Sequence, residues 1–182
     1  MYKPFGVVVG VLAAVNCSAW ADVQSGPAAG AKVPALPVFA ATGAHENKEL
    51  DYAAERKDRP TIYLIVQGAH FDRPMARFMK AIDKDLAEGK EKAEAVAVWL
   101  TDNQDETKER LPKVQQSLQF QATALAVSTG DTSGPKDWGV NDMAHLTVVV
   151  AHDGKVAATL AYRTVNETDA AAVIKALRKA VG

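Results

Sequence analysis

Residues 61–86 constrain the fold more than any other part of the chain. Residues 61–67 form an almost unbroken run of β-branched, aromatic and aliphatic side chains, which is typical of a strand covered on both faces. After a short loop, apolar residues recur at three- and four-residue steps opposite a charged side, which predicts an amphipathic helix. The apolar stripe consists of Met75, Phe78, Met79, Ile82 and Leu86. We therefore predict a central strand followed by a helix that packs on it.

The ends of this helix are marked by residues with suitable chemistry. Asp72 can accept hydrogen bonds from the free N–H groups of the first turn, and Pro74 has no N–H to lose there. Gly89 is a plausible stop. The sequence thus predicts a helix from about residue 73 to 88.

Two further segments predict how the sheet continues. Residues 95–100 are a second apolar run, and the strand–helix–strand order implies that they pair in parallel with the first strand through a right-handed crossover. Asp153-Gly154 separates two β-forming runs, 146–151 and 155–163, which predicts an antiparallel hairpin.

The remaining segments are shorter or more ambiguous. Residues 38–41 can form an edge strand, and the polar residues 45–49 indicate a turn. Residues 122–128 fit either a strand or a helix end. Residues 104–118 have helical character, but Pro112 either kinks this helix or begins a shorter one.

The chain ends in an amphipathic helix that Asn166 can cap, with Asp169 as the reciprocal carboxylate. The order of elements is therefore edge strand, strand, helix, strand, helix, hairpin and helix. A parallel beginning and an antiparallel ending predict an α/β domain with a mixed sheet and helices on both faces.

The first residues indicate export. Lys3 supplies a positive charge, residues 5–15 are apolar but too few to span a membrane, and Ala19-Trp20-Ala21 has the small-x-small pattern of a cleavage site. We predict a signal peptide at residues 1–21 and a secreted or periplasmic protein. No membrane-spanning segment is expected after cleavage.

The division of the chain follows from this cleavage. Residues 22–36 are rich in Ala, Gly and Pro and predict a flexible lead-in, so the folded domain is expected at 37–182. Cys17 is the only cysteine, and it lies in the predicted signal peptide. A lipoprotein anchored through Cys17 is the weaker alternative, because Asn16 precedes it where a small residue is expected.

The charge balance bears on possible partners. The formal net charge is −1 and the pI is about 6.4, and no Lys/Arg cluster with interleaved aromatic residues occurs. A chain of this kind lacks the positive surface that holds a phosphate backbone. We therefore do not expect nucleic acid as a partner.

Three stretches carry a resemblance to a known family. The chain resembles the thioredoxin-fold redoxins, the group that includes the thiol-specific antioxidant peroxiredoxins and the exported thioredoxin-like reductases. This resemblance implies a three-layer thioredoxin-like fold over about residues 30–182. The stretches are Gly30-Ala31-Lys32-Val33-Pro34 with Pro37-Val38-Phe39, Arg59-Pro60 with the strand after it, and Trp138-Gly139-Val140 with the hairpin around Asp153-Gly154-Lys155.

The chain departs from that family where the family's chemistry lies. The resemblance implies a nucleophilic cysteine in the loop before the central helix, but here that loop reads His70, Phe71, Asp72, Arg73 and Pro74. Phe71 and Pro74 stand at about the cysteine positions, and neither can form a thiolate.

The resemblance also implies a cis-proline before the final hairpin, and here Ala144 or His145 occupies that slot. We therefore expect no thiol–disulfide or peroxidase activity and no cofactor. The leading hypothesis is a binding or scaffold module of the cell envelope with a protein partner.

An alternative uses the residues that remain. Should His70, Asp72 and His145 converge, they could bind a metal or perform acid/base chemistry. The competing interpretation is that His70 is a solvated loop residue, Asp72 a helix cap and His145 a residue at the start of a strand. Similarly, Phe71 and Trp138 form either an exposed aromatic patch or part of the core.

Overall fold

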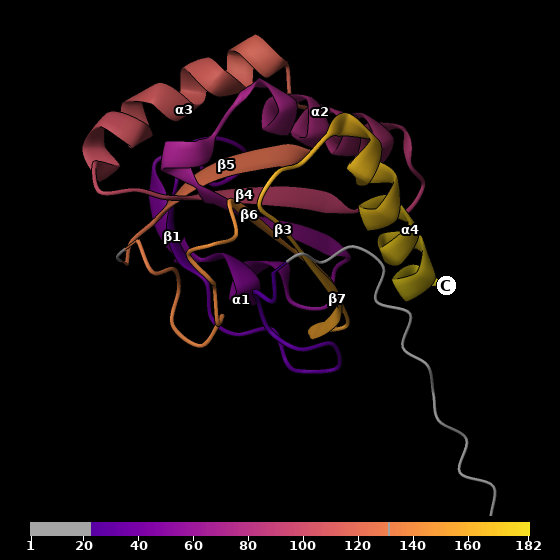
Figure 1. Cartoon of the computed structure of the whole chain (residues 1–182). Helices are drawn as coiled ribbons and strands as arrows, with labels where there is room; N and C mark the ends of the chain where they lie inside the picture. Colours follow the sequence, from indigo (N-terminus) through magenta and orange to yellow (C-terminus); the bar gives the residue numbers. More distant parts are fainter. Residues whose placement is uncertain (1–22, 131) are drawn as a thin grey trace, which may run out of the picture.

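A computed structural model describes residues 23–130 and 132–182 of the chain, so the predicted signal peptide and Cys17 lie outside the described residues. Within them, a seven-stranded sheet has the order β2-β1-β5-β4-β3-β6-β7 (Figure 1). The strands are β1 (Pro37–Ala40), β2 (Lys48–Asp51), β3 (Thr61–Gln67), β4 (Glu94–Leu100), β5 (Thr123–Ser128), β6 (Leu146–His152) and β7 (Lys155–Tyr162). The helices are α1 (Tyr52–Arg56), α2 (Arg73–Glu88), α3 (Gln104–Leu118) and α4 (Ala170–Val181), with 3₁₀ turns η1 (Gly68–His70) and η2 (Glu167–Asp169).

β3, the strand predicted to be central, lies inside the sheet between β4 and β6. β3 pairs in parallel with β4 from Thr61↔Glu94 to Gln67↔Leu100, and its other edge pairs antiparallel with β6. Its residues from Thr61 to Val66 are all buried, which explains why the run has no polar alternation. The predicted parallel pair and the antiparallel hairpin β6–β7 are confirmed. Residues 122–128, which fitted either a strand or a helix end, contain strand β5, which pairs in parallel with β4.

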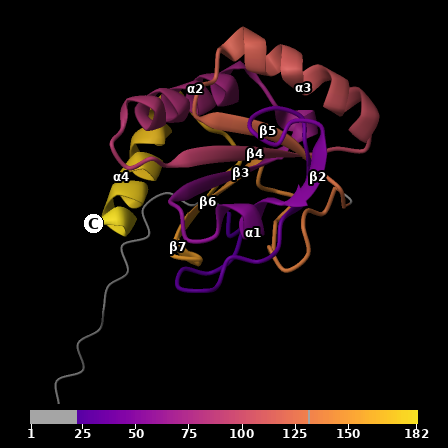
Figure 2. The same cartoon turned by 180° about the vertical axis from the view of Figure 1, so that it is seen from behind.

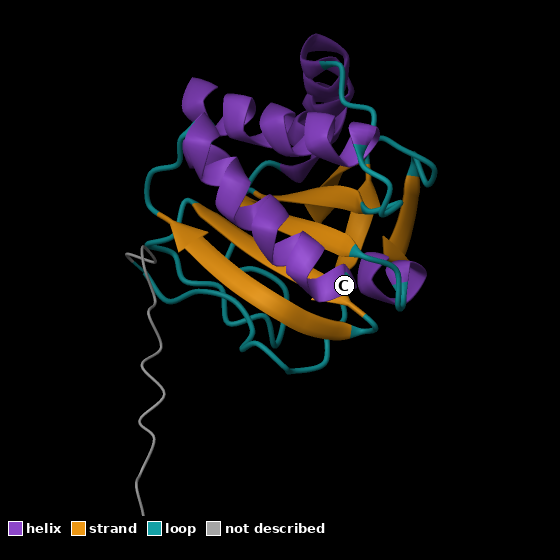
Figure 3. Cartoon of the chain, turned by 90° about the vertical axis from the view of Figure 1, so that its right-hand side faces the viewer, coloured by secondary structure: helices purple, strands orange, loops and turns teal. Residues whose placement is uncertain are grey.

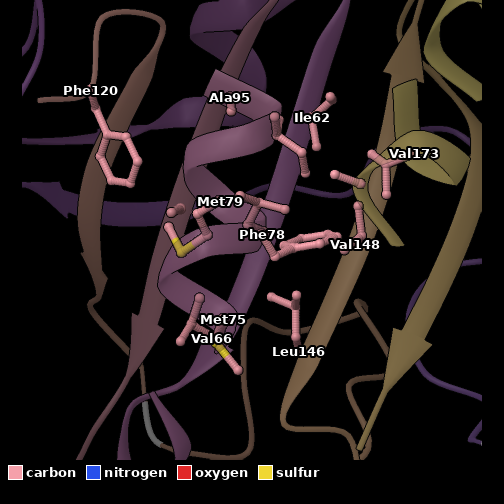
Figure 4. Packing of buried hydrophobic residues seen from close by; sticks show 14 of the residues in the cluster. Ile62, Val66, Met75, Phe78, Met79, Ala95, Phe120, Leu146, Val148 and Val173 are labelled. Carbon is pink, nitrogen blue, oxygen red and sulfur yellow. The ribbon is translucent and has the colours of Figure 1, made fainter. Parts of the chain in front are cut away.

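The three long helices lie on one face of the sheet (Figures 1 and 2). Each step from β3 to β4 and from β4 to β5 moves to the next strand in the same direction. Right-handed crossovers in one direction place their helices on one face, so α2 and α3 share a side. The side chains of Phe78 and Met79 on α2 pack there against Ile62 and Val148 of the sheet, while Val173 packs from α4 (Figure 4).

The other face is covered by the short helix α1 and by loops, as the side view in Figure 3 shows. Alternate residues of the strands, such as Tyr63 and Ile65, point to this side and pack with Trp138 and Leu36. The domain therefore has helices on both faces of a mixed sheet, as predicted, but most of the helical surface is on one face.

The segment before β1 differs from its expectation. Residues 22–36 were expected to be a flexible lead-in, whereas residues 23–36 pack against the sheet. The Ser25 hydroxyl lies 2.6 Å from the Thr147 hydroxyl in a buried contact, and the Thr159 hydroxyl donates to the Pro27 carbonyl at 2.6 Å. Gly30 N–H donates to the Val156 carbonyl. The Ala/Gly/Pro composition fits this packing because small residues let the segment approach β6 and β7 closely.

Two local predictions also need correction. The polar turn expected at 45–49 is only partly a turn, because β2 begins at Lys48 and pairs antiparallel with β1 at the sheet edge. Its side chains are half-buried or exposed, so it carries no apolar pattern by which the sequence could reveal it. Pro112 lies inside a continuous helix α3 and does not begin a shorter one. Only Thr107 and Leu111 of α3 are buried, so water can reach the carbonyl that Pro112 leaves without a donor.

Candidate binding site at the α2 N-terminus

The candidate site forms where β3 ends and α2 begins. The chain leaves β3 through η1 and enters α2 at Arg73, and His145 precedes β6 directly across from this turn. The Gln67 N–H donates to the His145 carbonyl at 3.0 Å, which joins the loop to the facing segment. The structure thus brings the loop 70–74 beside His145, whereas Ala144 is buried and packs with Val23 and Ala161. No peptide bond of the described residues is cis.

Asp72 caps α2. Its carboxylate accepts a hydrogen bond from the Met75 N–H at 2.9 Å, and Pro74 occupies the first turn. A free helix N-terminus is the feature that lowers a thiol pKa and binds anions. Here a carboxylate of the chain itself already occupies that position.

His70 and His145 form a stacked pair. Their ring centroids are 3.7 Å apart and the ring planes differ by 6°. Burial lowers the pKa of His145, and the neighbouring His70 and Arg163 lower it further, while Asp72 acts in the opposite direction. The surroundings of His145 therefore favour the neutral form of its imidazole.

This geometry does not support the metal alternative. The lone pair with which an imidazole nitrogen binds a metal lies in the plane of the ring. In two stacked, parallel rings these lone pairs point along separate parallel planes, so His70 and His145 cannot bind the same ion at the usual ligand distance. Within residues 23–130 and 132–182, no group of three His, Cys, Asp or Glu side chains is placed to hold a metal. His70 and His145 meet, but Asp72 does not complete a ligand set with them.

The two aromatic residues are separated by the sheet. Phe71 is half-buried beside the helical layer, with its ring 5.3 Å from that of Trp99. Trp138 is fully buried on the opposite face, and its Nε1–H donates to the Ala35 carbonyl at 3.0 Å. The core interpretation is correct for Trp138, and no joint aromatic patch exists.

A groove of about 420 Å³ lies between the loop and the segment after β7. His70, Phe71, Asp72 and His145 line one part of it, and Arg163 lines another. Arg163 is exposed, lines the groove and makes no ion pair with any described residue.

Sequence reasoning missed Arg163, although a signal for it existed. β7 is antiparallel to β6, and β6 is antiparallel to β3. β7 therefore runs in the same direction as β3, and the residues after it emerge at the same edge of the sheet as the loop 70–74. Tracing the direction of the predicted hairpin would have placed Arg163 beside the site.

Comparison with known proteins gives only structural matches. No family model and no curated protein matches the sequence. Among solved structures, a Chlorobium tepidum protein described as the thiol:disulfide interchange protein DsbE superposes with a TM-score of 0.62 at 18% identity, over 85% of this chain and 99% of that one. The fold is thioredoxin-like.

Other structural neighbours share this thioredoxin-like fold. A peroxiredoxin-like protein from Aquifex aeolicus has a TM-score of 0.58 at 14% identity, covering 86% of this chain and 90% of its own. A thioredoxin-like protein from Porphyromonas gingivalis has a TM-score of 0.62 at 16% identity, covering 82% and 91%. This thioredoxin-like chain has one cysteine, Cys17, which lies outside the described residues, so no described residue carries a thiol.

No helix in the described part of this thioredoxin-like chain is long and apolar enough to cross a membrane.

Proposed function

We propose that this chain is an exported thioredoxin-fold binding module of the cell envelope without thiol redox activity. The observation that carries the proposal is the N-terminus of α2. The position at which the redoxin resemblance implies a reactive thiol is capped by the Asp72 carboxylate, 2.9 Å from the Met75 N–H. Disulfide exchange begins with attack by a thiolate, and the chain after Ala21 contains no cysteine.

The groove beside Asp72 supplies the binding surface of the proposal. It combines a half-buried ring at Phe71, the stacked rings of His70 and His145, and the guanidinium of Arg163, which makes no ion pair with a described residue. An apolar contact next to a fixed cation suits a short polypeptide segment with an apolar side chain beside a carboxylate, because an arginine binds a carboxylate in two-point geometry. The occupant in this proposal is therefore a segment of a protein partner.

The test is capture of the partner with site variants. Tagged mature protein is cross-linked in the native envelope fraction, and the captured proteins are quantified. Arg163→Glu reverses the charge in the groove, so it should reduce capture of a specific partner at least tenfold. Phe71→Ser should do the same by removing the apolar contact.

The matched control is Lys175→Glu, which makes the same charge change on an exposed residue of α4 on the helical face. A partner retained by the wild type and by Lys175→Glu but lost from both groove variants supports the proposal. Equal capture by all four proteins, or no partner above background, contradicts it.

A further inference from the structure

A second cavity lies at the opposite edge of the sheet. It encloses about 330 Å³ and is bounded by α1, by the turn after β1 at Gly43, and by residues 121–124 at the start of β5. The groove beside Asp72 is at the carboxyl ends of the parallel strands, whereas this cavity is at their amino ends. Since β3 has seven residues, roughly 20 Å of strand separates the two.

A buried tyrosine reaches this cavity with an unused hydroxyl. Tyr52 is 2% exposed and lines the cavity, and its hydroxyl has no hydrogen-bond partner among the described residues. In that part of the chain the fully enclosed orphan polar atoms are Trp99 Nε1 and Thr123 Oγ1, so the Tyr52 hydroxyl is open to the cavity. Burial, followed by the nearby Glu94, raises its pKa, which keeps it a neutral donor. A hydroxyl that has no protein partner and opens into a cavity is free to bind a ligand there, in exchange for water.

The charges around the cavity are already balanced. The Arg56 guanidinium binds the Glu94 carboxylate at 2.6 Å and is itself almost fully buried. Arg59 and His45 both contact the same Glu55 oxygen, at 3.2 and 3.3 Å. The cavity is thus lined by two arginines and two glutamates. A ligand with a net charge of either sign would be repelled by the pair of side chains that carries the same sign.

The atoms left over in these pairs are a mixture of donors and acceptors. Glu94 Oε1 and Glu55 Oε2 make no hydrogen bond with a described residue, and neither does Arg59 Nη1. Glu55, Arg59 and Glu94 line the cavity together with Tyr52, so its lining residues carry two carboxylate acceptors and two donors without a protein partner. A hydroxyl group matches such a set because it donates and accepts at once.

We propose that this cavity binds a small neutral polyhydroxylated ligand of the sugar class. A zwitterion would have the right net charge, but its ammonium and carboxylate would lose water in order to face ions that are already paired. Sugar hydroxyls bring no such ionic penalty. The cavity volume lies at the lower end of the range for small-molecule sites, which suits one or two sugar rings.

The experiment is a titration of the mature protein with glucose and with trehalose, followed by backbone amide NMR. Saturable shifts are expected at Gly43, Tyr52, Arg59 and Gln121, with none at Arg163. Tyr52→Phe keeps the ring and removes only the hydroxyl, so it should weaken binding about three- to tenfold, the loss of one hydrogen bond. The control Tyr162→Phe removes a hydroxyl from a ring that packs on Phe78 at the other edge, and it should bind like the wild type.

A second variant guards against a folding defect in the first. Arg59→Gln changes a half-exposed side chain and should also weaken binding, with an otherwise unchanged amide spectrum. Shifts that saturate with alanine or glycine and not with the sugars would overturn the proposal, as would no shifts at all or wild-type affinity in both variants. Arg163→Glu should leave sugar binding unchanged, so this result is independent of the proposed partner groove.

Discussion

Asp72 is the residue on which the interpretation of the site depends most. Its carboxylate satisfies an N–H at the start of α2, and it lies close enough to His145 to affect the pKa of that imidazole. One side chain therefore has a structural role in the helix and an electrostatic role in the groove.

Replacing Asp72 should lower the free energy of unfolding by the amount typical of a lost helix N-cap. Asp72→Ala leaves the first turn of α2 without its acceptor and should lower the free energy of unfolding by about 1 kcal/mol. Urea unfolding of a protein that comprises residues 22–182 measures this. Asp142→Ala is the control, since Asp142 is exposed and its side chain makes no hydrogen bond with a described residue. A loss no larger than in the control would show that the cap is not formed.

The His70–His145 stack should make stability depend on pH in a defined direction. The native pKa of His145 is lowered from 6.5, so the unfolded chain binds more protons at this residue when the pH falls below about 6.5. The contribution of the neutral ring is complete above pH 6.5 and is lost as the pH falls through the native pKa. Asp72, which faces the ring, limits the loss, and Arg163 and His70 increase it.

Removing His145 tests this sign. His145→Asn should lose less unfolding free energy between pH 7 and pH 5 than the wild type does, measured by urea unfolding at both pH values. A steeper loss in the variant would mean that the imidazolium is stabilised in the native state, opposite to what the geometry indicates.

Among the segments of the fold, residues 23–36 differ most from the sequence-based expectation, because they pack on the sheet. This segment crosses β6 and β7, and Gly26 N–H donates to the Gly139 carbonyl. Gly26 has φ +95°, and a Cβ built there would lie 2.7 Å from Cγ2 of Thr159. The segment therefore depends on a glycine both for its backbone conformation and for its close approach.

Two glycine substitutions separate these requirements. Gly30 has a similar φ of +86° with no atom within 4 Å of an added Cβ. Gly30→Ala should therefore cost about 1 kcal/mol from the backbone alone, and Gly26→Ala should cost about 1–3 kcal/mol more because of the steric overlap. The difference between their urea unfolding free energies is the measurement. Equal costs would show that the segment does not pack as described.

For the whole molecule, much of the fold was predictable because its signals are local. The unbroken apolar run of β3, the stripe of α2 and the Asp153-Gly154 turn each specify an element, and the crossovers then give the order of the central strands. β2 was not predictable, since an exposed edge strand has no apolar face. The packing of 23–36 was missed because composition alone does not reveal contacts with residues more than a hundred positions away.

The candidate site was predictable only in part. The loop 70–74 and His145 could be placed at one edge from the order of the strands, but the 3.7 Å stack and its parallel planes depend on side-chain packing. The second cavity depends on pairs such as Arg56–Glu94, 38 positions apart, which no local pattern reveals.

Electron transfer by a protein that comprises residues 22–182 tests the central claim most directly. Insulin reduction and hydrogen peroxide consumption are measured with dithiothreitol as the electron source and with increasing protein. We predict rates equal to those of dithiothreitol alone, because no thiol is present at the α2 N-terminus or elsewhere after Ala21. A rate that rises in proportion to the protein and saturates with substrate would contradict the account.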